Sequence, residues 1–287
     1  MNRSPRYIIS EFKTILKRRL RPGILNIHCI DLQNAGDLAS SPFNYFATDK
    51  PVYKMNFWDL DAGQKPRPNF IPIVLGGGGL YYSPETILKL ATTHKGPLIA
   101  WGLGRNSSSS INNSAIYLGE EQFSLFGVRD WDDERIWVPC VSCMSYLFDY
   151  HRKSTPLHDV VVYEHKDMPI SIATSGFPVL KNSDKFENII KFLASGDTVL
   201  TNSYHGVYWA TLLGKKVLAI PSSNRFTAFR FPPVLTTLDE WMSSIYKGKS
   251  YPDSLEICQE QNLNFSLLVQ NILQIKLWRK VDWRIPS

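Results

Sequence analysis

Residues that could bind an anion and move a proton gather in one stretch of the sequence, Thr201-Asn202-Ser203-Tyr204-His205-Gly206. It follows an apolar run typical of a strand and precedes one typical of a helix, so His205 should lie at a helix N-terminus. The helix dipole there favours a bound anion and disfavours a permanent imidazolium, unless the anion itself restores the proton. We therefore expect these side chains to bind an anion, with His205 as general acid. A purely structural histidine is the alternative.

A carboxylate occupies the corresponding place after the first apolar run of the chain. The motif Asn34-Ala35-Gly36-Asp37 follows the run 24–30 after three residues. Asp37 could cap the helix that follows. It could instead face a ligand, as a general base or as the acceptor of a hydrogen bond from a sugar hydroxyl. The sequence leaves both roles open.

Arginines follow two further runs that look like strands. The pairs Gly104-Arg105 and Val128-Arg129 stand where such strands end, and a guanidinium there could bind carboxylate or phosphate through two parallel hydrogen bonds. Arg225 and Arg230 lie in a basic segment after the last predicted strand. We expect these four arginines to hold an anionic donor, and a solvated surface position is the alternative for each.

Four glycines, Gly76 to Gly79, follow the apolar run 70–75. Without a Cβ atom their backbone can approach a ligand closely, which makes Gly77 and Gly78 candidates for donor binding. The run matches neither the phosphate-binding loop of nucleotide hydrolases nor the dinucleotide fingerprint. A plain tight turn explains it equally well.

The chain has four cysteines, and only Cys140 and Cys143 are close in sequence. A single C-x-x-C pair lacks the second pair of ligands that a zinc site needs. His151 and His158 are also spaced too widely for the usual zinc motif. We expect buried thiols, no metal site and no cofactor.

Short apolar runs alternate with helix-length segments along the whole chain, which predicts an α/β protein with parallel sheets. A polar interruption at 150–157 suggests two Rossmann-like domains, 1–150 and 151–287, that face a central cleft. Ligands in such folds bind at the carboxyl ends of the strands, where the candidate residues stand. A terminal helix could pack back on the first domain.

The composition limits the partners. The 287 residues carry a net charge of +6, but the sequence has no nucleic-acid-binding motif, and we expect no nucleic-acid partner. It also has no signal-like or membrane-spanning apolar run, so we expect a cytoplasmic protein. The segment from Leu267 to Trp283 joins tryptophans to basic residues. It is either a packed terminal helix or, with the basic N-terminal stretch, a contact with the anionic inner face of the membrane.

Taken together, these motifs resemble those of the polysaccharide pyruvyl transferase family. The resemblance spans most of the chain, and the motifs become fairly specific through their order. They are Asn34-Ala35-Gly36-Asp37, Leu75-Gly76-Gly77-Gly78-Gly79-Leu80, Ala100-Trp101-Gly102-Leu103-Gly104-Arg105-Asn106, Phe126-Gly127-Val128-Arg129-Asp130, and Thr201 to Ala210 with Leu213-Gly214.

The resemblance implies two Rossmann-like domains arranged as in GT-B glycosyltransferases. It implies phosphoenolpyruvate as donor substrate, and as acceptor a sugar of a bacterial surface polysaccharide or of its lipid-linked precursor. Many members have Arg-Leu-His where this chain has Ser203-Tyr204-His205, so another cation would have to replace that arginine. In the chemistry it implies, His205 binds phosphate and acts as general acid, and Asp37 acts as base.

Two other functions remain open at this stage. A glycosyltransferase that uses a nucleotide sugar would share the fold and the need to bind an anion. A glycan- or anion-binding protein without catalysis would share the binding residues alone.

Overall fold

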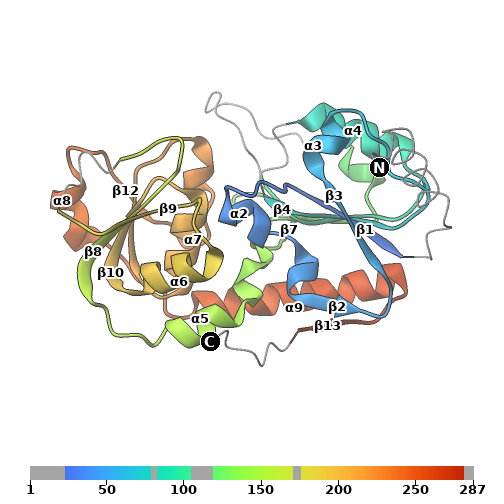
Figure 1. The fold of residues 1–287 in the computed structure, drawn as a ribbon. Coiled ribbons are helices and arrows are strands. Elements are labelled where there is room, and N and C mark those ends of the chain that lie inside the picture. The colour runs from blue at the N-terminus through green and yellow to red at the C-terminus, as the bar shows by residue number, and fades with distance from the viewer. Residues whose placement is uncertain (1–22, 79–82, 105–118, 171–175, 281–287) are drawn as a thin grey trace, which may run out of the picture.

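The structure is a computed structural model, and it describes residues 23–78, 83–104, 119–170 and 176–280. Two parallel sheets lie side by side, one built by each half of the chain (Figure 1). Every pairing within these two sheets is parallel. The predicted α/β architecture with parallel sheets is therefore confirmed.

The first sheet has the strand order β3-β1-β4-β5-β6-β7. Its strands are β1 (Ile24–His28), β3 (Val52–Asn56), β4 (Ile73–Gly78), β5 (Leu98–Leu103), β6 (Leu125–Val128) and β7 (Ile136–Trp137). The two central strands β4 and β5 are buried along their whole length, as their continuous apolar runs require when helices cover both faces of a sheet. The helices α2 (Ala35–Ala39), α3 (Phe57–Asp61) and α4 (Pro84–Thr93) follow β1, β3 and β4.

The second sheet has the order β12-β11-β10-β8-β9. Its strands are β8 (His158–Glu164), β9 (Val179–Lys181), β10 (Gly196–Thr201), β11 (Lys216–Ala219) and β12 (Val234–Leu235). Its helices are α6 (Phe186–Ala194), α7 (Tyr204–Leu212) and α8 (Trp241–Ser244). All nine residues of α7 are buried, because α7 lies between the two halves and packs against both α6 and the C-terminal helix α9 (Ser254–Leu273).

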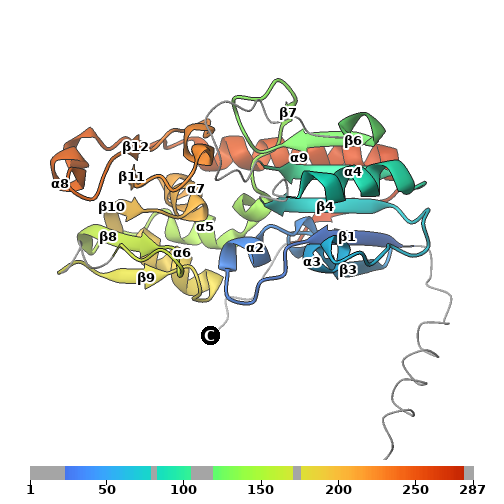
Figure 2. The ribbon, with the colours of Figure 1, turned by 90° about the horizontal axis from the view of Figure 1, so that it is seen from above.

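Two segments join the halves. The chain passes from one sheet to the other through α5 (Tyr146–His151), and α9 then returns beneath the first sheet (Figure 2). Asn262 on α9 accepts a hydrogen bond from the indole Nε1 of Trp101 on β5, at 2.9 Å. The largest cluster of buried apolar side chains accordingly includes residues of both sheets and of α9.

The glycine run differs from its prediction. Gly76, Gly77 and Gly78 form the end of β4 and are not a turn, whereas Gly79 lies outside the described residues. Close packing explains the first two glycines: a Cβ atom at Gly76 would lie 2.8 Å from Cδ of Pro42, and one at Gly77 would lie 3.3 Å from a backbone oxygen of β5. Gly78 has φ +96°, which favours glycine at that position.

The prediction of a helix over the segment from Leu267 to Trp283 is also corrected. α9 ends at Leu273 because Gln274 adopts a left-handed conformation, φ 51°. The chain then forms strand β13 (Leu277–Arg279), antiparallel to β2 (Phe46–Thr48). The predicted terminal helix therefore lies earlier in the sequence, and Trp283 lies outside the described residues. None of the described helices is long and apolar enough to cross a membrane.

Candidate functional site

A cavity of about 280 Å³ lies between the two halves of the molecule. Both halves contribute to its wall. The first half supplies Cys29, Asn34, Asp37, Trp58 and Arg129, and the second supplies His165, Asn182, Ser203, Tyr204, His205 and Arg225.

The lining residues stand where strands end, as expected for a parallel α/β fold. Cys29, Trp58, Arg129, His165, Asn182 and Ser203 lie one or two residues beyond β1, β3, β6, β8, β9 and β10. In these positions the backbone leaves the sheet, and the side chains line the cavity. The site is therefore built from six strands of two sheets.

His205 lies in the first turn of α7 and is 9% exposed. Its imidazole packs against α2, where a Cβ atom at Gly36 would lie only 2.1 Å from Nδ1. On the other side of the ring, Nε2 is 3.7 Å from the thiol of Cys140. Burial, together with the positive charges of Arg129 and Arg225, lowers the pKa of His205 to about 3. In the absence of a ligand, the ring is neutral at physiological pH.

Arg129 is 4% exposed, which is rare for an arginine. Its guanidinium lies over the ring of Tyr204, 4.0 Å from the ring centre, and Phe229 stacks on the same ring at 4.5 Å. A Cβ atom at Gly104 would lie 1.7 Å from Nε of Arg129, so glycine at the end of β5 makes room for the guanidinium. The charge of Arg129 is thus fixed at the cavity wall.

Asp37 lies on α2, one residue beyond the glycine that touches the imidazole. Its Oδ2 accepts a hydrogen bond of 2.9 Å from Nδ2 of Asn34, the residue that caps α2. Burial raises the pKa of Asp37 to about 6, with a further contribution from the charge of Asp31. The helix cap is therefore Asn34, and Asp37 is a cavity carboxyl with a pKa in the range of a general base.

Arg225 brings a second guanidinium to the cavity from the turn that follows β11. Burial and the charge of Arg129 lower the pKa of Arg225 to about 10, so the guanidinium of Arg225 stays charged at neutral pH. Against the two guanidinium groups the cavity wall offers one carboxyl, Asp37. Behind the wall the completely buried carboxyl of Asp130 lies 3.9 Å from Nε of Arg129 and offsets part of its charge. The wall itself, with two guanidinium groups and one carboxyl, favours an anionic ligand.

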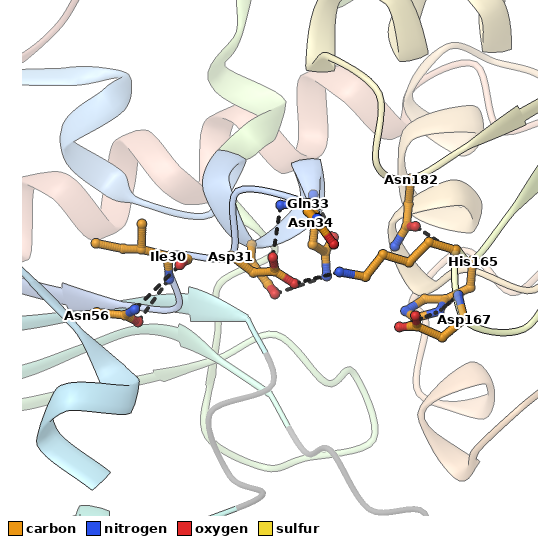
Figure 3. A network of polar contacts seen from close by, with 11 residues as sticks. Ile30, Asp31, Gln33, Asn34, Asn56, His165, Asp167 and Asn182 are labelled. Atoms are coloured by element: carbon orange, nitrogen blue, oxygen red, sulfur yellow. Dashed lines mark hydrogen bonds and ion pairs between the residues drawn. The ribbon is translucent and has the colours of Figure 1, made fainter. Parts of the chain in front are cut away.

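A polar network joins the loops that border the cavity (Figure 3). Nζ of Lys166 lies 3.0 Å from Oδ2 of Asp31, across the two halves. The backbone N–H of His165 donates to Oδ1 of Asn202 at 2.8 Å, and Lys166 donates in the same way to Asn182. Asn202 also donates from Nδ2 to the carbonyl of Met168. The structure thus places Asn202 behind the cavity wall, where it holds the loop after β8.

The structure places three other candidates away from the cavity. Arg230 lies over the rings of Trp131 and Trp137, at 4.5 and 4.7 Å, and does not line the cavity. Gly77 and Gly78 lie within β4 and do not line it either. Arg105 lies outside the described residues. The structure brings together Asp37, Arg129, Ser203, Tyr204, His205 and Arg225.

Five of the residues that line the cavity were not predicted from the sequence as site residues: Cys29, Asn34, Trp58, His165 and Asn182. The rule that ligands meet strand ends would have found His165, which follows the predicted strand 159–163 by two residues. Trp58 and Asn182 follow the strands β3 and β9. Neither strand has the apolar run that predicts a strand from the sequence. Because the two strands could not be predicted from the sequence, the residues that follow them could not be predicted as site residues either.

A second cavity, of about 490 Å³, lies between α3, the loop that follows it and α4. Lys65, Arg67 and Lys89 line it, but all three side chains are exposed. Asp61 and His94 of this larger cavity have lowered pKa values. The smaller cavity joins the buried Arg129 to His205 and Asp37, whose pKa values are shifted to about 3 and about 6, and we take it as the candidate site.

The described residues contain no group of three His, Cys, Asp or Glu side chains that could hold a metal ion. All four cysteines are buried and unpaired with one another, as predicted.

Neither the protein-family models nor the curated proteins include a match to this chain. Among solved structures, an uncharacterized protein from Klebsiella pneumoniae subsp. pneumoniae NTUH-K2044 superposes with a TM-score of 0.44 and 15% sequence identity. The match covers 80% of this chain and 98% of the other.

Proposed function

We propose that the protein is a pyruvyltransferase, which moves the enolpyruvyl group of phosphoenolpyruvate to a sugar of a surface polysaccharide or its lipid-linked precursor and forms a pyruvate ketal. One observation carries the proposal: a buried guanidinium group, a partly buried one, an imidazole and a carboxyl with a raised pKa line one cavity between the halves. Phosphoenolpyruvate has two anionic groups on a three-carbon skeleton, and each needs a cationic partner. The two facing α/β halves also suit the proposed GT-B-like arrangement.

The size of the cavity favours a small donor. Its volume of about 280 Å³ is below the range of ~300–1,000 Å³ typical of sites for drug-sized ligands. A nucleotide sugar is larger than phosphoenolpyruvate and would extend beyond this cavity. This is why we favour pyruvyl transfer over glycosyl transfer.

The reaction joins two hydroxyls of one sugar to the central carbon of the donor, and phosphate leaves. One hydroxyl proton ends on the methylene carbon, which becomes a methyl group, and the other leaves with the phosphate. Asp37, oriented by Asn34, accepts a hydroxyl proton. Arg129 and Arg225 hold the carboxylate and the phosphate. His205 binds the phosphate and serves as general acid, because a bound dianion offsets the two guanidinium charges and raises the pKa of the imidazole.

Trp58 marks the side from which the sugar enters. Its side chain lines the cavity and is 48% exposed. A flat, half-exposed indole offers an apolar surface to one face of a sugar ring and a polar N–H at its edge. The acceptor hydroxyls would then lie near Asp37, which belongs to the same half of the molecule.

Phosphorus NMR on the protein, phosphoenolpyruvate and a panel of candidate acceptor sugars tests the proposal. We expect inorganic phosphate to appear only when a suitable sugar is present, together with a sugar whose mass has increased by one pyruvate ketal. Release of nucleoside diphosphate from a nucleotide sugar would instead establish glycosyl transfer. Saturable binding of phosphoenolpyruvate without turnover on any sugar would establish a binding protein.

The pH dependence tests the role of Asp37. A base must be ionised to accept a proton, so the turnover should rise as the pH is raised through about 6, the pKa of Asp37. The Asp37→Asn variant should lose ~100- to 10,000-fold in turnover, the usual contribution of a general base, and lose this limb of the profile. A variant with normal turnover and an unchanged limb would exclude Asp37 as the base.

A further inference from the structure

His205 shares a hydrogen bond with a residue outside the cavity wall. Its Nε2 is 3.7 Å from Sγ of Cys140. The thiol is 1% exposed and lies in the connection between the two halves. Tyr208, one turn along α7, donates from its hydroxyl to the carbonyl of Cys140 at 2.7 Å. The thiol and the imidazole are therefore held together by the packing of α7 on this connection.

The contact belongs to a chain of four side chains. Sγ of Cys140 is also 3.3 Å from Oγ of Ser142, and that oxygen accepts a hydrogen bond of 3.0 Å from Nε1 of Trp209. Trp209 and Ser142 are completely buried. The order is Trp209, Ser142, Cys140, His205, and it begins and ends on α7, where Trp209 follows His205 by four residues.

The first member fixes the direction of the chain. An indole N–H can only donate, so Oγ of Ser142 is the acceptor of that bond. Among the described residues the only other partner of this hydroxyl is the thiol of Cys140. If the thiol donated to the hydroxyl, the buried O–H of Ser142 would have no acceptor, at a cost of about 1–3 kcal/mol. The hydroxyl therefore donates to sulfur, and the thiol proton is left for Nε2.

We infer that Trp209, Ser142 and Cys140 form a one-directional hydrogen-bond relay that holds His205 as the neutral tautomer with its proton on Nδ1. Nε2 accepts from the thiol and is not available to a ligand. Nδ1 lies at the opposite side of the ring, next to Gly36 of α2, and none of the described residues forms a hydrogen bond with it. Cys140 and Ser142 are positioning residues in this account.

The inference deepens the proposed function, since it names the atom of His205 that meets the donor. An N–H at Nδ1 lies beside α2, the helix that carries Asp37, and can donate to a phosphate or carboxylate oxygen before any protonation of the ring. The lowered pKa of His205, caused by burial, agrees with a neutral ring in the empty site. The site is thereby prepared to donate a hydrogen bond without holding a third positive charge beside two arginines.

The test uses the full chain without any substrate, so its outcome does not depend on the proposed reaction. Histidine labelled with ¹⁵N gives separate signals for Nδ1 and Nε2 of each of the six histidines, and the His205→Gln variant identifies those of His205. We expect the proton on Nδ1 in the wild type. A proton on Nε2 would overturn the inference.

Variants of the relay sharpen this test. Cys140→Ser keeps a donor of similar size and should keep the Nδ1–H tautomer. Cys140→Ala removes the donor and should give a mixture of tautomers, and a full retention of Nδ1–H there would also overturn the inference. Cys143→Ala is the matched control, because that buried thiol contacts Asn262 and not His205, and its spectrum should equal that of the wild type.

Discussion

At the scale of single residues, the site depends on which arginines face the cavity. Arg225 lines it, whereas Arg230, five residues later, lies over two tryptophan rings. Replacing Arg225 by Gln removes a charge-assisted contact worth about 1.5–3 kcal/mol. We expect the dissociation constant of phosphoenolpyruvate to rise ~10- to 100-fold, as measured by isothermal titration calorimetry.

Arg230→Gln is the matched control for that experiment. It removes the same charge from the same segment, but the lost interaction is a cation–π contact of about 1 kcal/mol. We expect the affinity for phosphoenolpyruvate to stay unchanged and the free energy of unfolding to fall slightly. Equal losses of affinity in both variants would show that the net charge of the segment, and not contact with the ligand, governs binding.

The imidazole of His205 makes stability depend on pH. Its pKa is lowered to about 3 in the folded protein, against ~6.5 in the unfolded chain. Between these values the unfolded state binds more protons, so the free energy of unfolding falls as the pH is lowered. From pH 7 to pH 5 the wild type should lose about 2 kcal/mol more than His205→Gln.

Urea unfolding at the two pH values measures this difference. His28, whose pKa burial also lowers, is present in both proteins and cancels in the comparison. If both proteins lost the same free energy of unfolding between the two pH values, the pKa of His205 would be the same in the folded and the unfolded state.

Some residues of the candidate site could be predicted from the sequence and others could not. Asp37, Arg129 and His205 follow strongly apolar runs, so the rule of strand ends was sufficient for them. Asn202 follows such a run too, yet its amide bonds the loop after β8, and nothing in a sequence distinguishes a ligand contact from a contact with a loop 37 residues away. The relay through Cys140 was equally inaccessible, because it joins residues 65 positions apart.

At the scale of elements, the helix α2 and the helix α7 determine where the imidazole lies. Gly36 on α2 touches the ring of His205, and a Cβ atom there would lie 2.1 Å from Nδ1. Alanine favours a helix over glycine by up to about 1 kcal/mol, but overpacking costs about 1–3 kcal/mol. We expect Gly36→Ala to lower both the free energy of unfolding and the affinity for phosphoenolpyruvate, measured by urea unfolding and calorimetry.

Leu38→Ala is the control on the same helix. Leu38 lines a separate cavity beside α6, so its truncation should lower stability but leave the affinity unchanged. An affinity equal to that of the wild type in Gly36→Ala would contradict the close packing of α2 on the imidazole.

Strands and helices could be predicted where the sequence has an apolar run or a typical helix-terminating residue. The strands β1, β4, β5, β8, β10 and β11 coincide with apolar runs of the sequence, and Gly214, with φ +70°, follows the end of α7 as expected of a helix terminus. The strands β3 and β9 are only partly buried or exposed, so they lack that signal. Strand β13 was predicted as helix, because its pairing with β2 connects segments 229 to 233 residues apart.

At the scale of the whole molecule, the two halves share one core. The main cluster of buried apolar side chains includes Val74 and Trp101 of the first sheet, Val161 and Val217 of the second, and Phe265 of α9. Lys166 and Asp31 add an ion pair across the halves, and Ala35 donates from its backbone to the carbonyl of Asn182 at 3.0 Å. The cavity between the halves is thus held by continuous packing below it.

Because the two halves share one apolar core, we expect a single cooperative unfolding transition. Asn262 on α9 accepts from Trp101 and donates to the carbonyl of Pro139. Asn262→Ala leaves the buried indole N–H of Trp101 without its acceptor, which should cost about 1–3 kcal/mol. Because α9 follows the second sheet in the chain and packs on the first, both halves should lose stability together. Tryptophan fluorescence and far-ultraviolet circular dichroism in urea should give coincident curves, both shifted to lower urea.

Ser266→Ala separates this effect from any change in α9 itself. Ser266 is a buried polar residue of the same helix, but its hydroxyl bonds the carbonyl of Leu263 within that helix, so no partner in the first sheet is left unsatisfied. We expect a smaller shift of both curves. Two separate transitions in Asn262→Ala, with only one of them moved, would show that the halves unfold independently and that the geometry of the cavity does not depend on α9.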